Sequence, residues 1–301
     1  MLRISMTTNT YMLSNNVRGY SLTELMLATT LFMLLAAGAL TLLVYARKTL
    51  NAIENMAELQ ERAAFVLALL EDDIRLAGYW GLHTNGALLS AAESVAVRCG
   101  NKEISAWALQ TELAFELADN SYPLPCPPYT QSAVSTDTLV LRHASPAVVT
   151  TRAGTIQILT SHDQGIIFSD GIKPELNSPA VIHNLQINAW YVDQASSESG
   201  LPALRRYTLT HNGVMQNQEI MPGVEDLQIL LGIDNNGDGH ADKFISSEQQ
   251  NKRPVVALQV QLQLRSSFLE PGHINTSFNM NDGYRRLKVA RTIALKNRQR
   301  S

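Results

Sequence analysis

The chain has 301 residues, of which 45% are hydrophobic and 17% are charged, and its formal net charge is -3. This composition excludes an intrinsically disordered protein, and the length suffices for one sizeable domain, or two small ones, with an accessory element. A small negative net charge provides no general attraction to polyanions. We therefore do not expect this chain to bind nucleic acid directly.

The first predicted element is an apolar helix that follows a polar leader. Residues 1–19 contain two arginines and no acidic residue, whereas Leu25–Val44 has no charged side chain. As a helix that rises about 1.5 Å per residue, Ser21–Val44 would measure roughly 36 Å, enough to cross a hydrocarbon core of about 30 Å. The sequence predicts a transmembrane helix over residues 20–45, with the cationic leader in the cytoplasm and the rest of the chain on the far side.

A single carboxylate, Glu24, lies near the start of this apolar segment. A charge buried in lipid costs at least about 2.5 kcal/mol, so Glu24 needs a partner. Cleavage after Gly19 would create an α-amino group on Tyr20 at nearly the same depth, and the start of a helix also favours a negative charge. The amine of one copy could neutralise Glu24 of the next and so set the axial register of a filament. We predict processing at Gly19 and Tyr20 and a charge pair in assembly for Glu24.

Two simpler interpretations of this segment explain less. An ordinary secretory signal peptide could be cut after the small residues 37–39, but apolar residues continue through Tyr45, and a glutamate is a poor guest in a signal-peptide core. A plain single-pass anchor leaves Gly19 and Glu24 without a role.

An amphipathic helix is predicted to continue over residues 46–78. Arg47–Ala77 contains no proline or glycine, and its apolar residues recur at helical spacing among charged neighbours. We expect the apolar face to pack on a globular domain and the helix to end at Gly78 and Gly81.

Residues 79–301 are predicted to form a β-rich globular domain, which makes the fold class α+β with a predominantly antiparallel sheet. The clearest strand is 258–264, where leucine or valine alternates with glutamine. The other elements expected are six strands and one short helix: Thr138–Arg142, Thr155–Thr160, Val181–Val192, Leu204–Thr210, Val224–Leu231, Leu287–Leu295 and a helix near Ser105–Leu117.

The two cysteines, Cys99 and Cys126, follow the apolar segment, so they share the oxidising side if that segment spans a membrane. We predict a disulfide between them, which would pin the proline-rich loop at 123–128. The alternative is two unpaired small hydrophobic side chains.

An aspartate-rich loop at 234–242 is the remaining local motif. Its candidate ligands for a hard cation such as calcium are oxygen-bearing groups: Asp234, Asn236, Asp238, Asp242 and the backbone carbonyl of His240. Ile245 stands where an EF-hand has its bidentate glutamate, so the loop is of a shorter type. The alternative is a polar hairpin turn with these residues for backbone reasons alone.

The stretch Arg18–Met26, RGYSLTELM, resembles the class III signal of type IV prepilins and pseudopilins. Tyr20 and Thr23 depart mildly from the phenylalanine and isoleucine more usual there. The resemblance implies that a prepilin peptidase and N-methyltransferase cuts after Gly19 and methylates Tyr20, and that Glu24 acts in assembly. It also implies a pilin-like fold anchored in the inner membrane, with its C-terminal domain in the periplasm.

More distant stretches are similar to the PilW family of minor pilins: Leu70–Gly81, Pro222–Gln228, Tyr284–Arg286 and Leu295–Arg298. This resemblance implies a low-abundance subunit that joins other minor pilins and the major pilin, primes pilus assembly and ends at the pilus tip beside a tip adhesin.

Three other functions are alternatives for a chain with this sequence. A minor pseudopilin of a type II secretion system shares the signal and the helix but is usually shorter, and a DNA-uptake pilus is compatible with the same assembly role. For a membrane-anchored enzyme, the sequence has no histidine pair at ligand spacing on a helical face and no GxSxG motif. We therefore expect no enzymatic activity.

Overall fold

The computed structural model describes residues 19–198, 200–249, 253–270 and 282–297. The predicted leader, apart from Gly19, and Arg298 of the last PilW-like stretch lie outside the described residues. The chain divides into two units, Met1–Ile53 and Glu54–Ser301.

A single long helix, α1 (Leu22–Leu76), occupies most of the first unit and the beginning of the second. It begins where the Ser21 carbonyl accepts hydrogen bonds from the backbone N–H groups of Glu24 and Leu25. It ends just before Gly78, whose φ of 73° lies in the left-handed region that favours glycine.

The part of α1 in the second unit is amphipathic. Its buried side chains recur at intervals of three or four residues: Leu59, Ala63, Val66, Leu67, Leu70, Asp73 and Ile74. Residues on the opposite face, such as Glu61 and Phe65, are exposed. Helical spacing of this kind buries one stripe of the helix against the strands.

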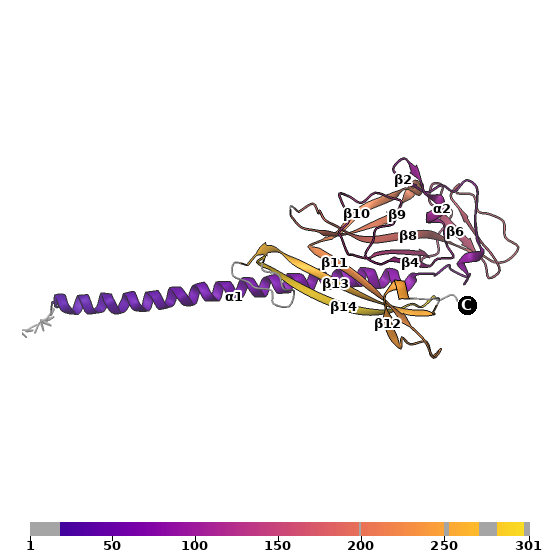
Figure 1. Cartoon of the computed structure of the whole chain (residues 1–301). Helices are drawn as coiled ribbons and strands as arrows, with labels where there is room; N and C mark the ends of the chain where they lie inside the picture. The colour runs from indigo at the N-terminus through magenta and orange to yellow at the C-terminus, as the bar shows by residue number, and fades with distance from the viewer. Residues whose placement is uncertain (1–18, 199, 250–252, 271–281, 298–301) are drawn as a thin grey trace, which may run out of the picture. The chain divides into compact units, whose positions relative to one another are not determined.

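An eight-stranded sheet forms one layer of the second unit (Figure 1). Its strands are β1 (Leu89–Ala91), β4 (Phe115–Ala118), β5 (Thr138–Ala144), β6 (Gln157–Thr160), β7 (Gly165–Phe168), β8 (Val181–Asp193), β9 (Ala203–Leu209) and β10 (Met215–Pro222). The order is β1-β7-β6-β8-β5-β4, and β9 pairs with both β8 and β10. All these pairs are antiparallel except β1 with β7.

A four-stranded antiparallel sheet forms the other layer, in the order β12-β11-β13-β14. Its strands are β11 (Val224–Ile233), β12 (Lys243–Ile245), β13 (Val255–Leu269) and β14 (Tyr284–Ala294). In Figure 1 these orange and yellow strands run along the second half of α1. The short elements are β2 (Arg98–Cys99), β3 (Lys102–Glu103), α2 (Ser105–Ala108) and three 3-10 turns at Gly86–Leu88, His211–Gly213 and Ser247–Gln249.

The main hydrophobic core lies between α1 and the two sheets. The helix contributes residues such as Leu70, β13 contributes Leu258 to Leu264 at alternate positions, and β8 contributes Trp190 and Val192. The opposite face of β8, with Ile187, packs in a second core beneath the loops around the disulfide. The α+β class is therefore confirmed as a long apolar N-terminal helix packed on a mostly antiparallel β domain.

The predicted helix at Ser105–Leu117 is wrong beyond Ala108. Only Ser105–Ala108 is helical, and Phe115–Ala118 is strand β4, paired with β5. Tertiary pairing with a fully buried strand outweighs local helix propensity here. The sequence reasoning also missed β10, because its run of Gln, Asn and Glu residues has low strand propensity.

Candidate membrane-anchoring and assembly site

The apolar half of α1 leaves its side chains uncovered. Large hydrophobic residues from Leu22 to Ile53 are exposed, with Leu35 at 74% and Phe32 at 71%. Within the described residues, α1 is the one helix long and apolar enough to cross a membrane, and none of its most apolar 18-residue window is buried. Exposed apolar surface on this scale marks a membrane or protein contact, and the segment fits a single-pass membrane anchor.

The three residues singled out for processing and assembly lie at the start of this anchor. Gly19 and Tyr20 precede the helix, and Tyr20 is 87% exposed. Glu24 occupies the first helical turn and is also exposed, and the nearby hydroxyl groups of Ser21 and Thr23 lie 2.8 Å apart. The N-terminal position of Glu24 is one where helical N–H groups favour a carboxylate.

A buried carboxylate, Asp73, ties the second half of α1 to the eight-stranded sheet. It accepts hydrogen bonds from His143 Nε2 at 2.8 Å, Asn188 Nδ2 at 2.8 Å and Trp190 Nε1 at 2.6 Å. The Nδ1 atom of His143 lies 2.9 Å from the carbonyl oxygen of Ala144. Three hydrogen bonds to one buried carboxylate therefore tie the helix to strands β5 and β8.

The Asp73 cluster was not predicted from the sequence, although the sequence contains a signal for it. Asp73 lies on the apolar stripe of the helix, three residues after Leu70 and next to Ile74. A carboxylate at such a position needs buried donors. Its donors come from β5 and β8, about 70 and 115 residues further along the chain, so only the fold identifies them.

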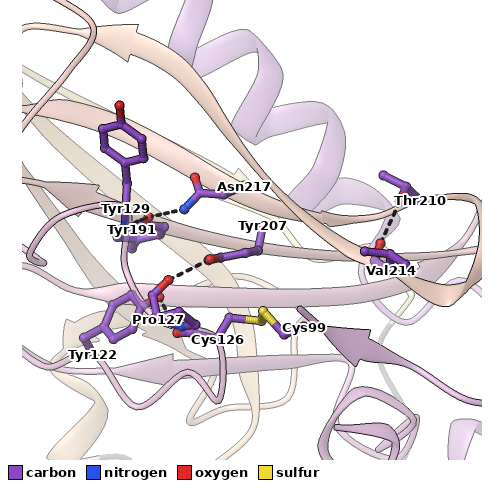
Figure 2. The surroundings of a disulfide bond; sticks show 10 residues. All are labelled: Cys99, Tyr122, Cys126, Pro127, Tyr129, Tyr191, Tyr207, Thr210, Val214 and Asn217. Atoms are coloured by element: carbon purple, nitrogen blue, oxygen red, sulfur yellow. Dashed lines mark hydrogen bonds between the residues drawn. A yellow bond between two sulfur atoms is a disulfide. The ribbon is translucent and has the colours of Figure 1, made fainter. Parts of the chain in front are cut away.

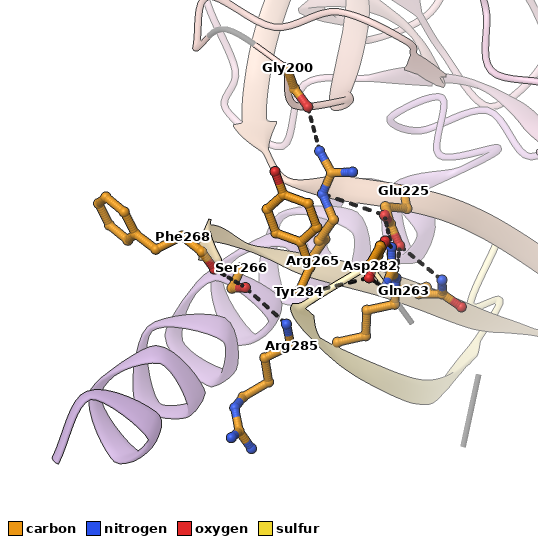
Figure 3. A network of polar contacts seen from close by, with 10 residues as sticks. Gly200, Glu225, Gln263, Arg265, Ser266, Phe268, Asp282, Tyr284 and Arg285 are labelled. Carbon is orange, nitrogen blue, oxygen red and sulfur yellow. Dashed lines mark hydrogen bonds and ion pairs between the residues drawn. The ribbon is translucent and has the colours of Figure 1, made fainter. Parts of the chain in front are cut away.

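Two of the PilW-like stretches meet at Glu225 (Figure 3). This carboxylate on β11 accepts hydrogen bonds from Arg286 Nε at 2.7 Å and Nη2 at 3.0 Å, and from Gln263 Nε2 at 3.0 Å. Arg286 also donates to Asp282 at 2.8 and 2.6 Å. These contacts hold the pKa of Asp282 well below its usual range and raise the pKa of Arg286. The arrangement links the starts of β11 and β14 through β13.

The PilW-like stretch that begins at Pro222 also contacts α1. Arg62 Nη1 donates to the Pro222 carbonyl at 3.3 Å, and the same arginine pairs with Glu58. Gly223 follows with a φ of 83°, and its carbonyl accepts from the Arg265 N–H at 2.7 Å. The PilW-like stretches therefore contribute Asp73 and the Pro222 carbonyl, which hydrogen-bond the helix to the rest of the β domain.

The two cysteines, Cys99 and Cys126, form a disulfide with Cα atoms 5.6 Å apart (Figure 2). Two tyrosines hold the same loop through its carbonyl groups. Tyr122 Oη donates to the Cys126 oxygen at 2.8 Å, and Tyr207 Oη donates to the Pro127 oxygen at 2.6 Å. The loop is thus fixed by hydrogen bonds as well as by the covalent bridge.

A third tyrosine lies in the interior of this cluster. Tyr191 Oη accepts hydrogen bonds from the Tyr129 N–H at 3.0 Å and from Asn217 Nδ2 at 2.7 Å. Burial raises the pKa of Tyr191 to about 12 and raises the pKa of Tyr122 further above its usual value. Both phenols therefore stay neutral at physiological pH and act as structural hydrogen-bonding groups.

The aspartate-rich loop forms a polar turn. Four of its side chains accept hydrogen bonds from backbone N–H groups of the same loop: Asp234, Asn236, Asp238 and Asp242. The His240 N–H is the donor to Asp238. Asn236 Nδ2 lies 3.2 Å from both Asp238 Oδ2 and Asp242 Oδ1. In the part of the chain that the structure describes, no group of three or more His, Cys, Asp or Glu residues is arranged to hold a metal, and calcium binding stays a prediction.

Together, the exposed apolar helix and the β domain packed on its second half define an α+β protein whose N-terminal helix fits a single-pass membrane anchor. The model of the PilW family, described as type IV pilus-assembly protein W, matches residues 189–297. This match includes the stretches at 222–228 and 284–286 but not Leu70–Gly81, and it supports the predicted resemblance to a PilW-family type IV pilus-assembly protein. No curated protein and no solved structure matches the chain.

Proposed function

We propose that this chain is a minor type IV pilin that primes pilus assembly, cut after Gly19 and N-methylated at Tyr20. The observation that carries the proposal is Glu24 in the first turn of an exposed apolar helix. A plain anchor gains nothing from a carboxylate at that depth. The family match to a pilus-assembly protein points to the same function.

The proposed chemistry at the N-terminus is a charge pair between copies. Cleavage would expose the amino group of Tyr20, which lies four residues before Glu24 at the start of the apolar helix. In lipid, each charge lowers the cost of burying the other, so the pair forms only when two subunits adopt the correct axial offset. Glu24 would then set the axial offset between neighbouring subunits in the filament.

The proposed partners follow from this role. A prepilin peptidase and N-methyltransferase would act on Gly19 and Tyr20 while the chain is anchored in the inner membrane with its domain in the periplasm. Other minor pilins, the major pilin and a tip adhesin would join it in a tip complex.

Intact-mass analysis of the membrane-extracted protein tests the processing step. The wild type should begin at Tyr20 with one added methyl group, and a bulky Gly19→Val substitution should leave the leader in place. A mature chain that begins at Ala39 or later, or no cleavage at all, contradicts the proposal.

Glu24→Ala tests the assembly step separately. We expect normal cleavage and methylation, but loss of the protein from sheared pili, because the partner amine is left unpaired. Glu54→Ala is the matched control, since Glu54 is an exposed glutamate of the same helix beyond the apolar segment. A Glu24 variant that enters pili at the wild-type level would show that the charge pair plays no part. In a deletion strain, loss of protein secretion with normal pili would favour a pseudopilin instead.

A further inference from the structure

Strand β10 is an edge strand with one side open. On one side it pairs with β9 along Met215–Pro222. On the other side, the described residues contribute a single parallel bridge, between Arg98 and Val214. Strand β2 ends at Cys99, where the chain turns back into β3. Beyond Val214, this side of β10 therefore has no strand paired with it in the described part of the chain.

The pairing with β9 determines which backbone groups of β10 face the open side. The Thr210 N–H donates to the Val214 carbonyl at 2.8 Å, so these two residues form a hydrogen-bonded pair. In an antiparallel ladder, hydrogen-bonded and non-hydrogen-bonded pairs alternate. Asn217 and Glu219, three and five residues after Val214, therefore belong to pairs of the second kind. Their N–H and C=O groups point away from β9, toward the open side.

A cleft of about 520 Å³ adjoins the first part of this open side (Figure 2). Its lining includes Cys99, Pro127, Tyr207, Val214 and Asn217, so the loop held by the disulfide forms one wall and strands β9 and β10 form the other. The volume lies within the roughly 300–1,000 Å³ usual for ligand pockets. Asn217 Oδ1 is buried and has no hydrogen-bond partner among the described residues. The cleft therefore combines mostly apolar walls with one unused acceptor.

Both walls of the cleft are held in place by contacts within the chain. The disulfide of Cys99 and a hydrogen bond of 2.6 Å from Tyr207 Oη to the Pro127 carbonyl hold the loop. On the strand side, Gly213 has a φ of 66°, and a Cβ there would lie 2.1 Å from the Ala96 carbonyl oxygen. This close contact fixes the chain before β2 against the start of β10. A site fixed in advance lowers the ordering cost of binding.

We propose that the open side of β10 and the adjoining cleft bind an extended segment of another protein. The segment adds as a strand beyond β2, with its backbone paired to Asn217 and Glu219 and one apolar side chain in the cleft. Unpaired N–H and C=O groups at a sheet edge are satisfied in register by another extended chain. A lipid or a small apolar molecule leaves them unpaired. The proposal goes beyond the proposed function and does not depend on Glu24 or on the membrane anchor.

The side chains of β10 argue for a different chain as the occupant, and against a second copy of β10. Residues 216–219 are Gln, Asn, Gln and Glu, so β10 of another copy would place polar side chains against the apolar walls of the cleft. A bulge between Glu219 and Met221 ends the regular ladder, which leaves about five residues of β10 for pairing. The fitting partner is a short strand in which apolar side chains alternate with polar ones.

Peptide selection on the full chain in detergent micelles tests the proposal. The probe is a phage-displayed library of random dodecapeptides. The peptide that binds the wild type most tightly is then synthesised with a fluorescent label, and its affinity is measured by fluorescence anisotropy.

Two matched variants and two modified peptides separate strand pairing from other binding. Asn217→Pro removes an N–H that β9 does not use, and proline is tolerated where the N–H faces the outside of a sheet edge. Asn217→Ala is the control, since it removes the same side chain and keeps the N–H. The peptide is also N-methylated at its odd or at its even positions, because only alternate N–H groups of an added strand face β10.

We expect N217P to bind the peptide at least tenfold more weakly than N217A. One methylated set should weaken binding to the wild type at least tenfold, and the other set less than threefold. If N217P fails to fold, the methylated peptides decide alone.

Three results would overturn the proposal. The first is a library in which no peptide binds the wild type. The second is equal binding by folded N217P and N217A, or equal effects of the two methylated sets, since either excludes strand pairing. The third is self-association of the wild type in micelles that N217P abolishes, which would identify a second copy of the chain as the occupant.

Discussion

Replacing Asp73 with alanine should separate α1 from the eight-stranded sheet. The substitution leaves the donors of His143, Asn188 and Trp190 without an acceptor at a site where Asp73 is only 7% exposed. A buried donor left unpaired costs about 1–3 kcal/mol, and three donors lose their shared acceptor here. Because these terms overlap, we expect a loss of about 3–5 kcal/mol. For a domain of this size that corresponds to a fall of roughly 6–20 °C in Tm.

The assay is thermal unfolding of the full chain in detergent micelles, followed by tryptophan fluorescence. Trp190 reports directly, because its indole N–H is a member of the cluster. Asp72→Ala is the control, since Asp72 is the adjacent aspartate of the same helix and is exposed, and its loss should stay within about 0.5 kcal/mol. Equal melting temperatures for D73A and D72A would refute the reasoning that the cluster fastens the helix.

Gly223→Ala should destabilise by about 2 kcal/mol or more in the same assay, because Gly223 has a φ of 83° and a Cβ would lie 2.8 Å from a backbone oxygen of β13. Gly100→Ala, with a φ of 58° and nothing within 4 Å of its Cβ, should cost about 1 kcal/mol, and equal losses would exclude a steric cause. Arg286 lowers the pKa of Asp282, so this carboxylate stabilises the fold above its ordinary pKa of 3.8 and less as the pH falls below it. The difference in Tm between wild type and D282N should therefore shrink in acid, and a constant difference would contradict the assignment. If the Asp234 loop binds calcium, the metal should raise Tm relative to chelator, whereas equal values would argue for a plain polar turn.

Much of the β domain could be read from alternation in the sequence. The glutamine–leucine pattern at 258–264 predicted the centre of β13, because one face of that strand is buried and the other is wet. Strand β10 was not predicted, because its Gln, Asn and Glu residues have weak strand propensity, and most of strand β4 was predicted as helix, because its conformation depends on pairing with β5. Short-range patterns contain no information about such partners.

The sequence by itself determined the apolar helix, the place of Glu24 within it and the similarity to PilW-family stretches. The first two features depend on residue order along one helix, where spacing alone sets which side chains share a face and how far the helix reaches, and the third is a match of local sequence. Only the tertiary structure decided what the PilW-like stretches do, because Asp73 meets Trp190, and Glu225 meets Arg286, across gaps of 117 and 61 residues. A carboxylate on the apolar face of a helix, such as Asp73, indicates from sequence that buried donors are needed, but only the fold determines which donors reach it.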